Sequence, residues 1–343
     1  MDIGIYTFGD LPTGVTGPSA ARQRLQDILA AARLADESGL DVFGVGEHHR
    51  SDYAVSAHTV VLGAIAAVTR RIRLSSAVTI LSSDDPVRVF EAFATLDLLS
   101  GGRAELMAGR GAFVESFPLF GLDLREYDSL FDEKLALLLQ LNRDERITWQ
   151  GRHRPALRDA EVAPRPLHGR LPIWIGAGGT PQSAVRAGQL GLPLNLANIG
   201  GEPARFKPFI DLYRQSGQQA GHAPHDLRVA VSAHLHVQRD AQQARDQFYP
   251  HYQSYLRHNL PQRDRGWFMP RSEYERLAGP QGCLFVGSPQ QIIDKILYEH
   301  ELFGHQRFMA QIDIGGLPFA QVAQAIELLA TEVRPAVRRA PSA

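Results

Sequence analysis

Eight short apolar runs, separated by longer amphipathic segments, are the feature that most limits how this chain can fold. Most runs are continuous rather than alternating, which is typical of strands covered on both faces. Strands that alternate with helices form a parallel sheet, and eight of them close a (β/α)8 TIM barrel. We therefore expect one α/β domain over residues 1–343, with strands at 3–8, 42–46, 72–81, 104–108, 173–177, 192–197, 227–237 and 307–313.

Helix signals fill the segments between the runs. Residues 20–38 and 58–69 place apolar residues at the i, i+3, i+4, i+7 spacing, and residues 126–141 are rich in leucine. A side chain that can cap a helix precedes a proline at three further points, which predicts three more helix starts. These capping residues are Asp85, Thr180 and Ser288.

Two segments break the alternation and are expected to be insertions in the barrel. Residues 142–171 are polar and rich in proline. Residues 238–282 contain many charged side chains. The large apolar side chains among them are Tyr252, Tyr255, Trp267, Phe268 and Met269.

The composition excludes several classes of protein. Lys and Arg number 36 and Asp and Glu number 37, so nothing in the charge points to nucleic acid or an acidic membrane as partner. Cys283 is the only cysteine, which excludes an intrachain disulfide and a Cys-rich metal site. The sequence has neither a signal-peptide pattern at its start nor an apolar stretch of ~20 residues. We expect a cytoplasmic protein that acts on a small molecule.

A carboxylate and two imidazoles follow the second predicted strand directly, at Glu47, His48 and His49. Charged groups are costly at the edge of a core unless something satisfies them. Ligands and catalysis collect at the carboxyl ends of parallel strands, so this cluster is a candidate catalytic site. Structural salt bridges are the alternative. The spacing is not that of the HExxH zinc motif.

Three other predicted strand ends carry residues suited to a ligand. The small residues Ser76 and Ala77 would let a flat ring approach the backbone. The alternative, which the sequence alone favours, is a simple packing constraint. Arg110 lies between Gly109 and Gly111, and its guanidinium matches the geometry of a phosphate. A surface arginine in a turn is the alternative there.

The glycine-rich turn Gly178-Gly179-Thr180 connects a predicted strand to a predicted helix. Free N–H groups and the positive end of the helix converge at such a turn and favour an anion. Thr180 and Ser183 can add hydroxyl groups. The turn is neither a GxGxxG nor a Walker A sequence, so it indicates a phosphate without indicating a dinucleotide or ATP.

His234 and His236 lie two residues apart on the seventh predicted strand. Paired histidines on a barrel strand bind metal in metal-dependent hydrolases, with further ligands from other strand ends. Only Glu47, His48 and Asp313 are obvious candidates for those ligands.

Taken together, these segments resemble the bacterial luciferase-like family of flavin-dependent monooxygenases over nearly the whole chain. The most specific pieces are 46–49, 85–88 followed by 95–103, 109–111 and the turn at 178–180. The resemblance implies a TIM barrel that binds FMN or the deazaflavin F420 at its C-terminal mouth and often forms a homodimer.

The resemblance also implies roles for individual residues. His48 matches the active-site histidine that manages protons when the flavin reacts with O2. Ala77-Val78 matches a pair, often joined by a cis peptide bond, beside the isoalloxazine ring. Arg110 and the turn of Gly178, Gly179 and Thr180 match the phosphate site. Gly109 stands where luciferase has a reactive cysteine, and the long luciferase loop is absent, so light emission and a long-chain aldehyde are not implied.

We therefore expect an FMN-dependent oxidoreductase, a monooxygenase that uses reduced FMN and O2 on a small organic substrate. A separate NAD(P)H:flavin reductase would supply the reduced FMN. Three alternatives stay open: an F420-dependent hydride-transfer enzyme, a metal-dependent hydrolase that uses His234 and His236, and a non-catalytic partner in a heterodimer. The sequence does not specify the substrate.

Overall fold

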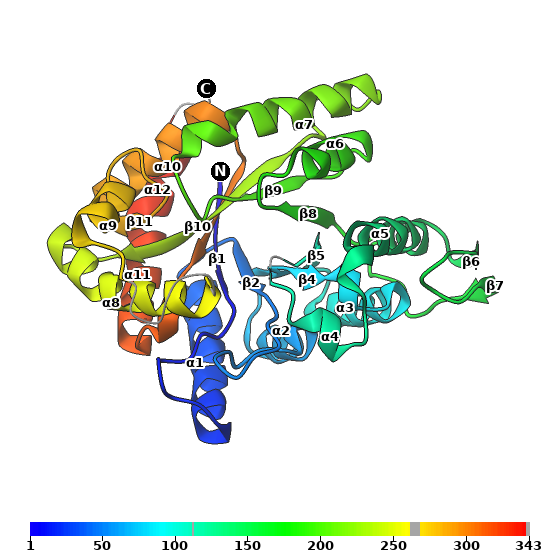
Figure 1. Ribbon diagram of the computed structural model, residues 1–343, viewed down its shortest axis with the longest axis horizontal. Helices are drawn as coiled ribbons and strands as arrows, with labels where there is room; N and C mark the ends of the chain where they lie inside the picture. Colours follow the sequence, from blue (N-terminus) through cyan, green and yellow to red (C-terminus); the bar gives the residue numbers. More distant parts are fainter. Residues whose placement is uncertain (112, 261–267, 341–343) are drawn as a thin grey trace.

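Eight parallel strands form a closed barrel, as the alternation predicts (Figure 1). The computed structural model describes residues 1–111, 113–260 and 268–340. The ring closes because β12 pairs with both β1 and β10. The barrel strands are β1 (Asp2–Thr7), β2 (Val42–Val45), β3 (Arg73–Ser76), β5 (Ala104–Gly109), β8 (Ile173–Ala177), β9 (Leu194–Ala197), β10 (Val229–Val237) and β12 (Arg307–Gln311).

The strand register gathers the carboxyl ends of the strands at one rim. Tyr6 of β1 lies opposite Gly44 of β2 and Gln311 of β12. All neighbouring barrel strands run parallel in this way, so the loops that follow them meet around one mouth. The predicted site residues follow β2, β3, β5 and β8 and therefore belong to this mouth.

Helices cover the outside of the barrel (Figure 1). They bury apolar faces against the strands; α1, for example, buries Ile28, Ala31, Ala32 and Ala35. The helices are α1 (Pro18–Glu37), α2 (His58–Val68), α3 (Pro86–Ser100), α4 (Ser116–Leu119), α5 (Tyr127–Arg143), α6 (Pro181–Gln189), α7 (Lys207–Gln219), α8 (Ala241–Asn259), α9 (Arg271–Ala278), α10 (Pro289–Phe303), α11 (Phe319–Leu328) and α12 (Arg334–Arg339). The helices predicted at 20–38, 58–69 and 126–141 correspond to α1, α2 and α5.

Two of the three predicted helix caps are confirmed. The Asp85 carboxylate accepts hydrogen bonds from the backbone N–H groups of Val87 and Arg88 at the start of α3. Ser288 and Gln291 form a reciprocal capping box at the start of α10.

The predicted strand 72–81 is wrong in its length. β3 ends at Ser76, and the chain resumes as the short strand β4 (Thr79–Ile80), which pairs with β5. The sequence pattern also missed β11 (Phe285–Gly287), a three-residue strand that extends the sheet beside β10. Neither change alters the order of the eight barrel strands.

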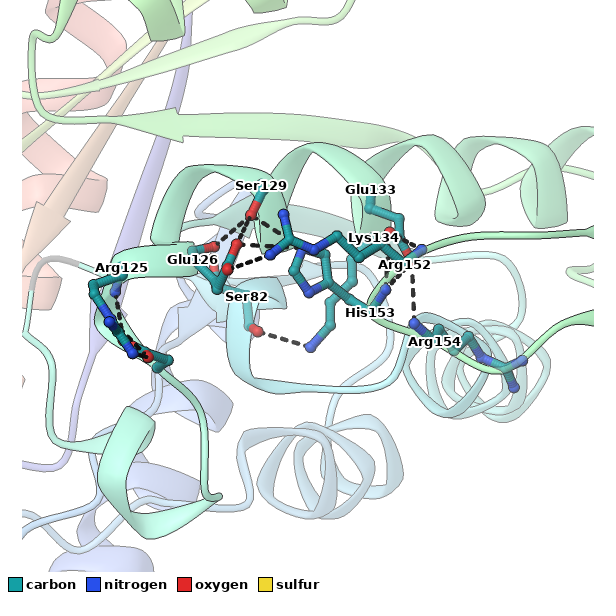
Figure 2. A network of polar contacts seen from close by, with 10 residues as sticks. Ser82, Arg125, Glu126, Ser129, Glu133, Lys134, Arg152, His153 and Arg154 are labelled. Atoms are coloured by element: carbon teal, nitrogen blue, oxygen red, sulfur yellow. Dashed lines mark hydrogen bonds and ion pairs between the residues drawn. The ribbon is translucent and has the colours of Figure 1, made fainter.

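The predicted insertion at 142–171 contains an antiparallel hairpin, β6 (Arg146–Trp149) and β7 (Leu157–Glu161), which projects from the barrel (Figure 1). Glu133 of α5 holds the hairpin loop, as Figure 2 shows: its carboxylate accepts hydrogen bonds of 2.7–3.1 Å from the backbone N–H groups of residues 152–154. The next residue, Lys134, donates a 2.7 Å hydrogen bond to the carbonyl oxygen of Ser82. Helix α5 therefore joins the hairpin to the loop that follows β4.

The predicted insertion at 238–282 contains α8 and α9, and Trp267 within it lies outside the described residues. Helix α8 reaches the barrel mouth. Its residue Asn259 hydrogen-bonds the hydroxyl group of Tyr53 from the β2–α2 loop, and its residue Tyr255 lines the cavity described below. The insertion therefore forms part of the wall of the mouth.

A buried ion pair fills the opposite end of the barrel. The guanidinium of Arg307 pairs with the carboxylate of Glu105 and lies 4.5 Å from the centre of the Trp174 ring. Between this pair and the mouth, the interior of the barrel contains two small apolar clusters. One consists of Tyr6, Val42 and Met309, and the other of Met107, Trp174 and Ala230. Within the ranges described above, no helix is long and apolar enough to span a membrane.

Candidate active site

A cavity of about 290 Å³ opens at the C-terminal mouth of the barrel. Six of the predicted site residues line it, namely His48, Ala77, Val78, Arg110, Gly178 and Thr180. Gly179 is not among the lining residues. The structure thus brings together residues from four separate strand ends, spread over more than a hundred positions of the sequence.

Ala77 and Val78 form a part of the cavity wall that carries only small side chains. Their peptide bond is cis, as the resemblance implies. Two glycines make room for the Val78 side chain: a Cβ atom on Gly109 would lie 2.6 Å from Cγ2 of Val78, and one on Gly176 would lie 2.7 Å from Cγ1. Real Cβ contacts are not this short, so any side chain at either position would displace Val78. Gly109, the position of the luciferase cysteine, is therefore a packing requirement here.

Glu47 fixes the backbone just after this wall. Its Oε1 accepts a 2.6 Å hydrogen bond from the N–H of Ile80, and its Oε2 lies 3.2 Å from Nε2 of His49. Burial raises the pKa of Glu47, but the hydrogen bond with His49, the nearby His58 and the Ile80 N–H together hold it below its ordinary value. The same hydrogen bond raises the pKa of His49. Glu47 and His49 are therefore engaged with each other and with the backbone at Ile80.

His48 lies in an aromatic enclosure with one nitrogen bound to a carboxylate. Its Nδ1 atom lies 2.8 Å from Oε1 of Glu115. Its ring stacks on Tyr53 at 4.2 Å and meets the edge of Phe8 at 4.7 Å. Burial raises the pKa of Glu115, but the hydrogen bond from His48, a backbone hydrogen bond and the charges of His48 and Arg50 together hold it below its ordinary value, so Glu115 is ionised at neutral pH. Proton exchange with a ligand in the cavity must therefore use Nε2 of His48.

Arg110 and two hydroxyl groups converge on the rim of the cavity. Nη2 of Arg110 donates hydrogen bonds to Oγ1 of Thr180 at 2.8 Å and to Oγ of Ser183 at 3.2 Å. Its Nη1 pairs with Asp128 of α5 at 2.5 Å. The predicted cap at Thr180 is wrong, because this hydroxyl contacts Arg110 and Ser183 and accepts no hydrogen bond from the backbone of α6. The first backbone N–H groups of α6 therefore have no side-chain cap, and they begin next to the residues that the Arg110 guanidinium contacts.

The two glycines of the turn have different roles. Gly179 has a φ of +102°, and a Cβ atom there would lie 2.7 Å from the ring of Phe206, so the turn itself requires glycine. Gly178 lines the cavity, and a Cβ atom there would meet open space. Gly179 shapes the rim but does not line the cavity. That its backbone helps to bind a cofactor stays a prediction.

The two histidines of the metal alternative have different surroundings. His234 lines the cavity, whereas Nε2 of His236 binds Gln247 of α8 at 2.9 Å and the His236 ring stacks on Phe248. Among the described residues, no group of three or more His, Cys, Asp or Glu side chains is placed to hold a metal ion. The structure therefore gives the hydrolase alternative no support.

Several residues of the site were not assigned to it by sequence reasoning, and four of them contact or enclose its predicted part. Glu115 and Asp128 are the carboxylates that bind His48 and Arg110, and Tyr53 and Tyr255 complete the aromatic wall. Only Asp128 carries a signal in the sequence, because an acidic residue in the first turn of a helix close to a candidate anion-binding arginine is a natural partner for it.

A comparison with sequence models of protein families shows to which family the chain belongs. The sequence model of the luciferase-like monooxygenases matches residues 1–306. The chain belongs to the luciferase-like monooxygenase family. A curated family member, the N-acetyl-S-alkylcysteine monooxygenase of Bacillus subtilis, is 33% identical over 226 residues, and the match spans 65% of each protein. F420-dependent enzymes also occur among the relatives of this luciferase-like protein.

Solved structures of other proteins share the fold. The monooxygenase RslO1 from Streptomyces bottropensis superposes with a TM-score of 0.84 at 25% identity, covering 98% of this chain and 99% of that one. The oxygenating constituent of 3,6-diketocamphane monooxygenase from Pseudomonas putida, solved in complex with FMN, superposes with a TM-score of 0.77 at 19% identity and covers 98% of both chains. At 19% identity, the similarity to the diketocamphane monooxygenase concerns the fold alone. It confirms the (β/α)8 barrel.

Proposed function

We propose that this luciferase-like protein is an FMN-dependent monooxygenase that uses reduced FMN and O2 on a small organic substrate. One observation carries the proposal: three features face one cavity. They are the candidate phosphate site at Arg110, the wall of small side chains at Ala77-Val78, and His48 with its buried hydrogen bond to Glu115. The family supports an oxidoreductase, and the diketocamphane relative is described as binding FMN.

The rim residues fit the phosphate group of FMN. Arg110 supplies a guanidinium, Thr180 and Ser183 supply hydroxyl groups, and the start of α6 supplies uncapped N–H groups. Hydrogen bonds from charged donors to phosphate are among the strongest in proteins. Asp128 already pairs with Arg110 and fixes the direction of its guanidinium. It is also largely exposed, with 70% of its side chain in solvent, so its charge is well screened.

The wall at Ala77-Val78 suits an aromatic ring system. The Ala77 side chain is small, and Val78 is turned into the space left by Gly109 and Gly176. A ring can therefore lie against the backbone at this point. When bound, reduced FMN supplies the electrons with which O2 is activated, because the oxygen chemistry belongs to the cofactor rather than to the protein.

His48 is the group that would hold or move a proton. The Glu115 carboxylate accepts the Nδ1 hydrogen, which leaves the lone pair of Nε2 free to act as a base. Once protonated, the imidazolium is stabilised by the same carboxylate. The aromatic rings of Phe8, Tyr53 and Phe113 pack around this histidine and would keep water away from it.

An isotope experiment tests the proposal. Purified protein is supplied with FMN, NADH, an added flavin reductase and 18O2, together with a mixture of small thioethers, ketones, aldehydes and alcohols. We expect one 18O atom in a product, detected by mass spectrometry, and no product without the reductase. A parallel reaction uses reduced and oxidised F420 without O2. Hydride transfer to or from F420 with no labelled product would contradict the proposal and favour the F420-dependent alternative.

Two predictions from the sequence accompany this proposal. The need for a separate NAD(P)H:flavin reductase is tested by omitting the reductase in the same assay. The homodimer is a prediction from the resemblance, and light scattering on the eluting protein tests it by measuring the mass.

A further inference from the structure

His234 is a polar side chain of the cavity that the proposed cofactor site does not use. It lies on β10, is 1% exposed and lines the cavity. Neither of its ring nitrogens has a hydrogen-bond partner among the described residues. Leaving a buried polar group unpaired costs free energy, so a site of this kind is adapted to a ligand that supplies the partner.

Gln311 repeats this situation on the neighbouring strand. It is the register partner of His234 across the β10–β12 ladder, it lines the same cavity, and its buried Nε2 has no partner among the described residues. Tyr6, the register partner of Gln311 on β1, lines the cavity beside it. Three strands thus carry one row of polar side chains, two of them with unpaired nitrogens.

The row of His234, Gln311 and Tyr6 lies away from the candidate phosphate site at Arg110. In the ring of eight strands, β12 is separated from β5, which ends at Arg110, by three strands on either side. Gln311 and Arg110 therefore stand on opposite walls. A cofactor held by its phosphate at Arg110 and by its ring at Ala77-Val78 would leave the β10–β12 wall to the substrate.

The row carries no charge that could receive an ionic group. Among the described lining residues, the other charged or titratable groups apart from tyrosines are Glu47, His48 and Arg110. Glu47 and His48 are engaged by His49 and Glu115, and Arg110 lies on the opposite wall. Burial lowers the pKa of His234 to about 3, so the imidazole is neutral and offers one donor and one acceptor. A carboxylate or phosphate at this wall would lose its hydration without gaining a counter-ion.

We propose that His234 and Gln311 receive the carbonyl or hydroxyl group of an uncharged substrate, which is otherwise apolar and packs against Tyr6, Phe8 and Tyr255. This inference rests on the proposed function in so far as the cofactor occupies the Arg110 side. It narrows the substrate class to neutral molecules with one polar head and distinguishes this cavity from one that binds an acidic or phosphorylated substrate.

Ligand-binding measurements test this proposal without turnover. Cyclohexanone and cyclohexanecarboxylate share a ring and differ in charge; their affinities are measured by saturation-transfer NMR on the cofactor-free and the FMN-loaded protein. We expect cyclohexanone to bind at least about tenfold more tightly. His234→Phe should weaken cyclohexanone binding about fivefold to tenfold, the usual value of one hydrogen bond, while FMN affinity stays unchanged.

His236→Phe is the matched control, because this residue lies on the same strand but outside the cavity lining, and it should leave cyclohexanone binding unchanged. His234→Gln keeps a donor and an acceptor and should restore most of the affinity. Circular dichroism checks that each variant folds.

Three results would overturn the inference about His234, and the first two are cyclohexanecarboxylate binding as tightly as the ketone and no detectable binding of cyclohexanone. Loss of FMN affinity rather than ketone affinity in His234→Phe would assign the row to the cofactor and overturn it as well. Failure of wild-type protein to bind FMN would defeat the proposed function instead, and the ketone preference of the cofactor-free protein would still decide the inference.

Discussion

Nδ1 of His48 lies 2.8 Å from Oε1 of Glu115, a residue 67 positions further along the chain. The ring is 5% exposed and stacked on Tyr53, so it has little freedom to turn away from the carboxylate. A histidine fixed in this manner presents a single nitrogen to the cavity. This geometry suits proton transfer at one defined point.

Substitution of His48 by alanine should lower kcat about a hundredfold, because general acid–base catalysis contributes on that order. The affinity for FMN should change little, since His48 lies apart from the Arg110 site. Turnover is measured at saturating reduced FMN, and FMN affinity separately by fluorescence. Wild-type turnover in this variant would remove His48 from the mechanism.

Glu115→Gln should slow turnover about tenfold, a smaller loss than that of His48→Ala, because the amide holds the ring but does not stabilise its protonated form. Asp123→Asn is a control, since Asp123 is an exposed carboxylate that pairs with Arg125 outside the cavity. The kinetic comparison requires both variants to unfold at a temperature near that of the wild type. Equal effects of the two substitutions would show that Glu115 acts through general electrostatics only.

The Glu47–His49 pair should make stability depend on pH. The pKa of Glu47 is lowered, so its contribution is fully present above its ordinary value of 4.5 and is lost as the pH falls through the folded-state value. The pKa of His49 is raised, so its contribution is fully present below 6.5 and is lost as the pH rises through the folded-state value. The pair therefore stabilises most between these two values.

His49→Gln tests this dependence through the free energy of unfolding, measured with urea. The deficit of the variant relative to wild type should be about 1 kcal/mol near pH 5.5 and should shrink toward pH 9. A deficit that grows with pH would contradict the assigned ion pair.

The ion pair at the closed end of the barrel should stabilise the fold only as a pair. Glu105→Gln removes the nearer and more buried of the two carboxylates beside the Arg307 guanidinium and leaves only the partly exposed Asp2, 3.5 Å away, so it should cost about 3 kcal/mol of unfolding free energy. The double variant Glu105→Leu, Arg307→Met replaces both charges with apolar groups and should lose much less. Chemical unfolding measures both variants; a double variant that loses as much unfolding free energy as Glu105→Gln would contradict this account.

The sequence predicts the barrel well because its signals are local and repeated. Continuous apolar runs between amphipathic segments identify all eight barrel strands. The third run fails in detail because nothing between Ile72 and Leu81 marks the break at Ala77-Val78, where neither glycine nor proline occurs. Strand β11 was missed because three residues, Phe285–Gly287, are too few to form a pattern.

The candidate site is predictable where its residues follow strand ends. His48, Arg110 and the turn at Gly178 to Thr180 all satisfy this rule. Glu115 does not, since it lies in an irregular segment and gains its role from a contact across 67 positions. Thr180 shows the limit of local rules in another way: its position before Pro181 predicts a helix cap, but the nearby guanidinium of Arg110 takes its hydroxyl instead.

Binding of FMN compared with riboflavin tests the central claim most directly, because the two differ only in the phosphate group. The affinities of oxidised and reduced forms are measured by fluorescence titration and equilibrium dialysis, with wild type and with Arg110→Gln. The account predicts that wild type binds FMN about tenfold to a hundredfold more tightly than riboflavin, the value of one charge-assisted hydrogen bond, and that Arg110→Gln removes most of this preference. Equal affinity of the wild-type protein for FMN and riboflavin would contradict it.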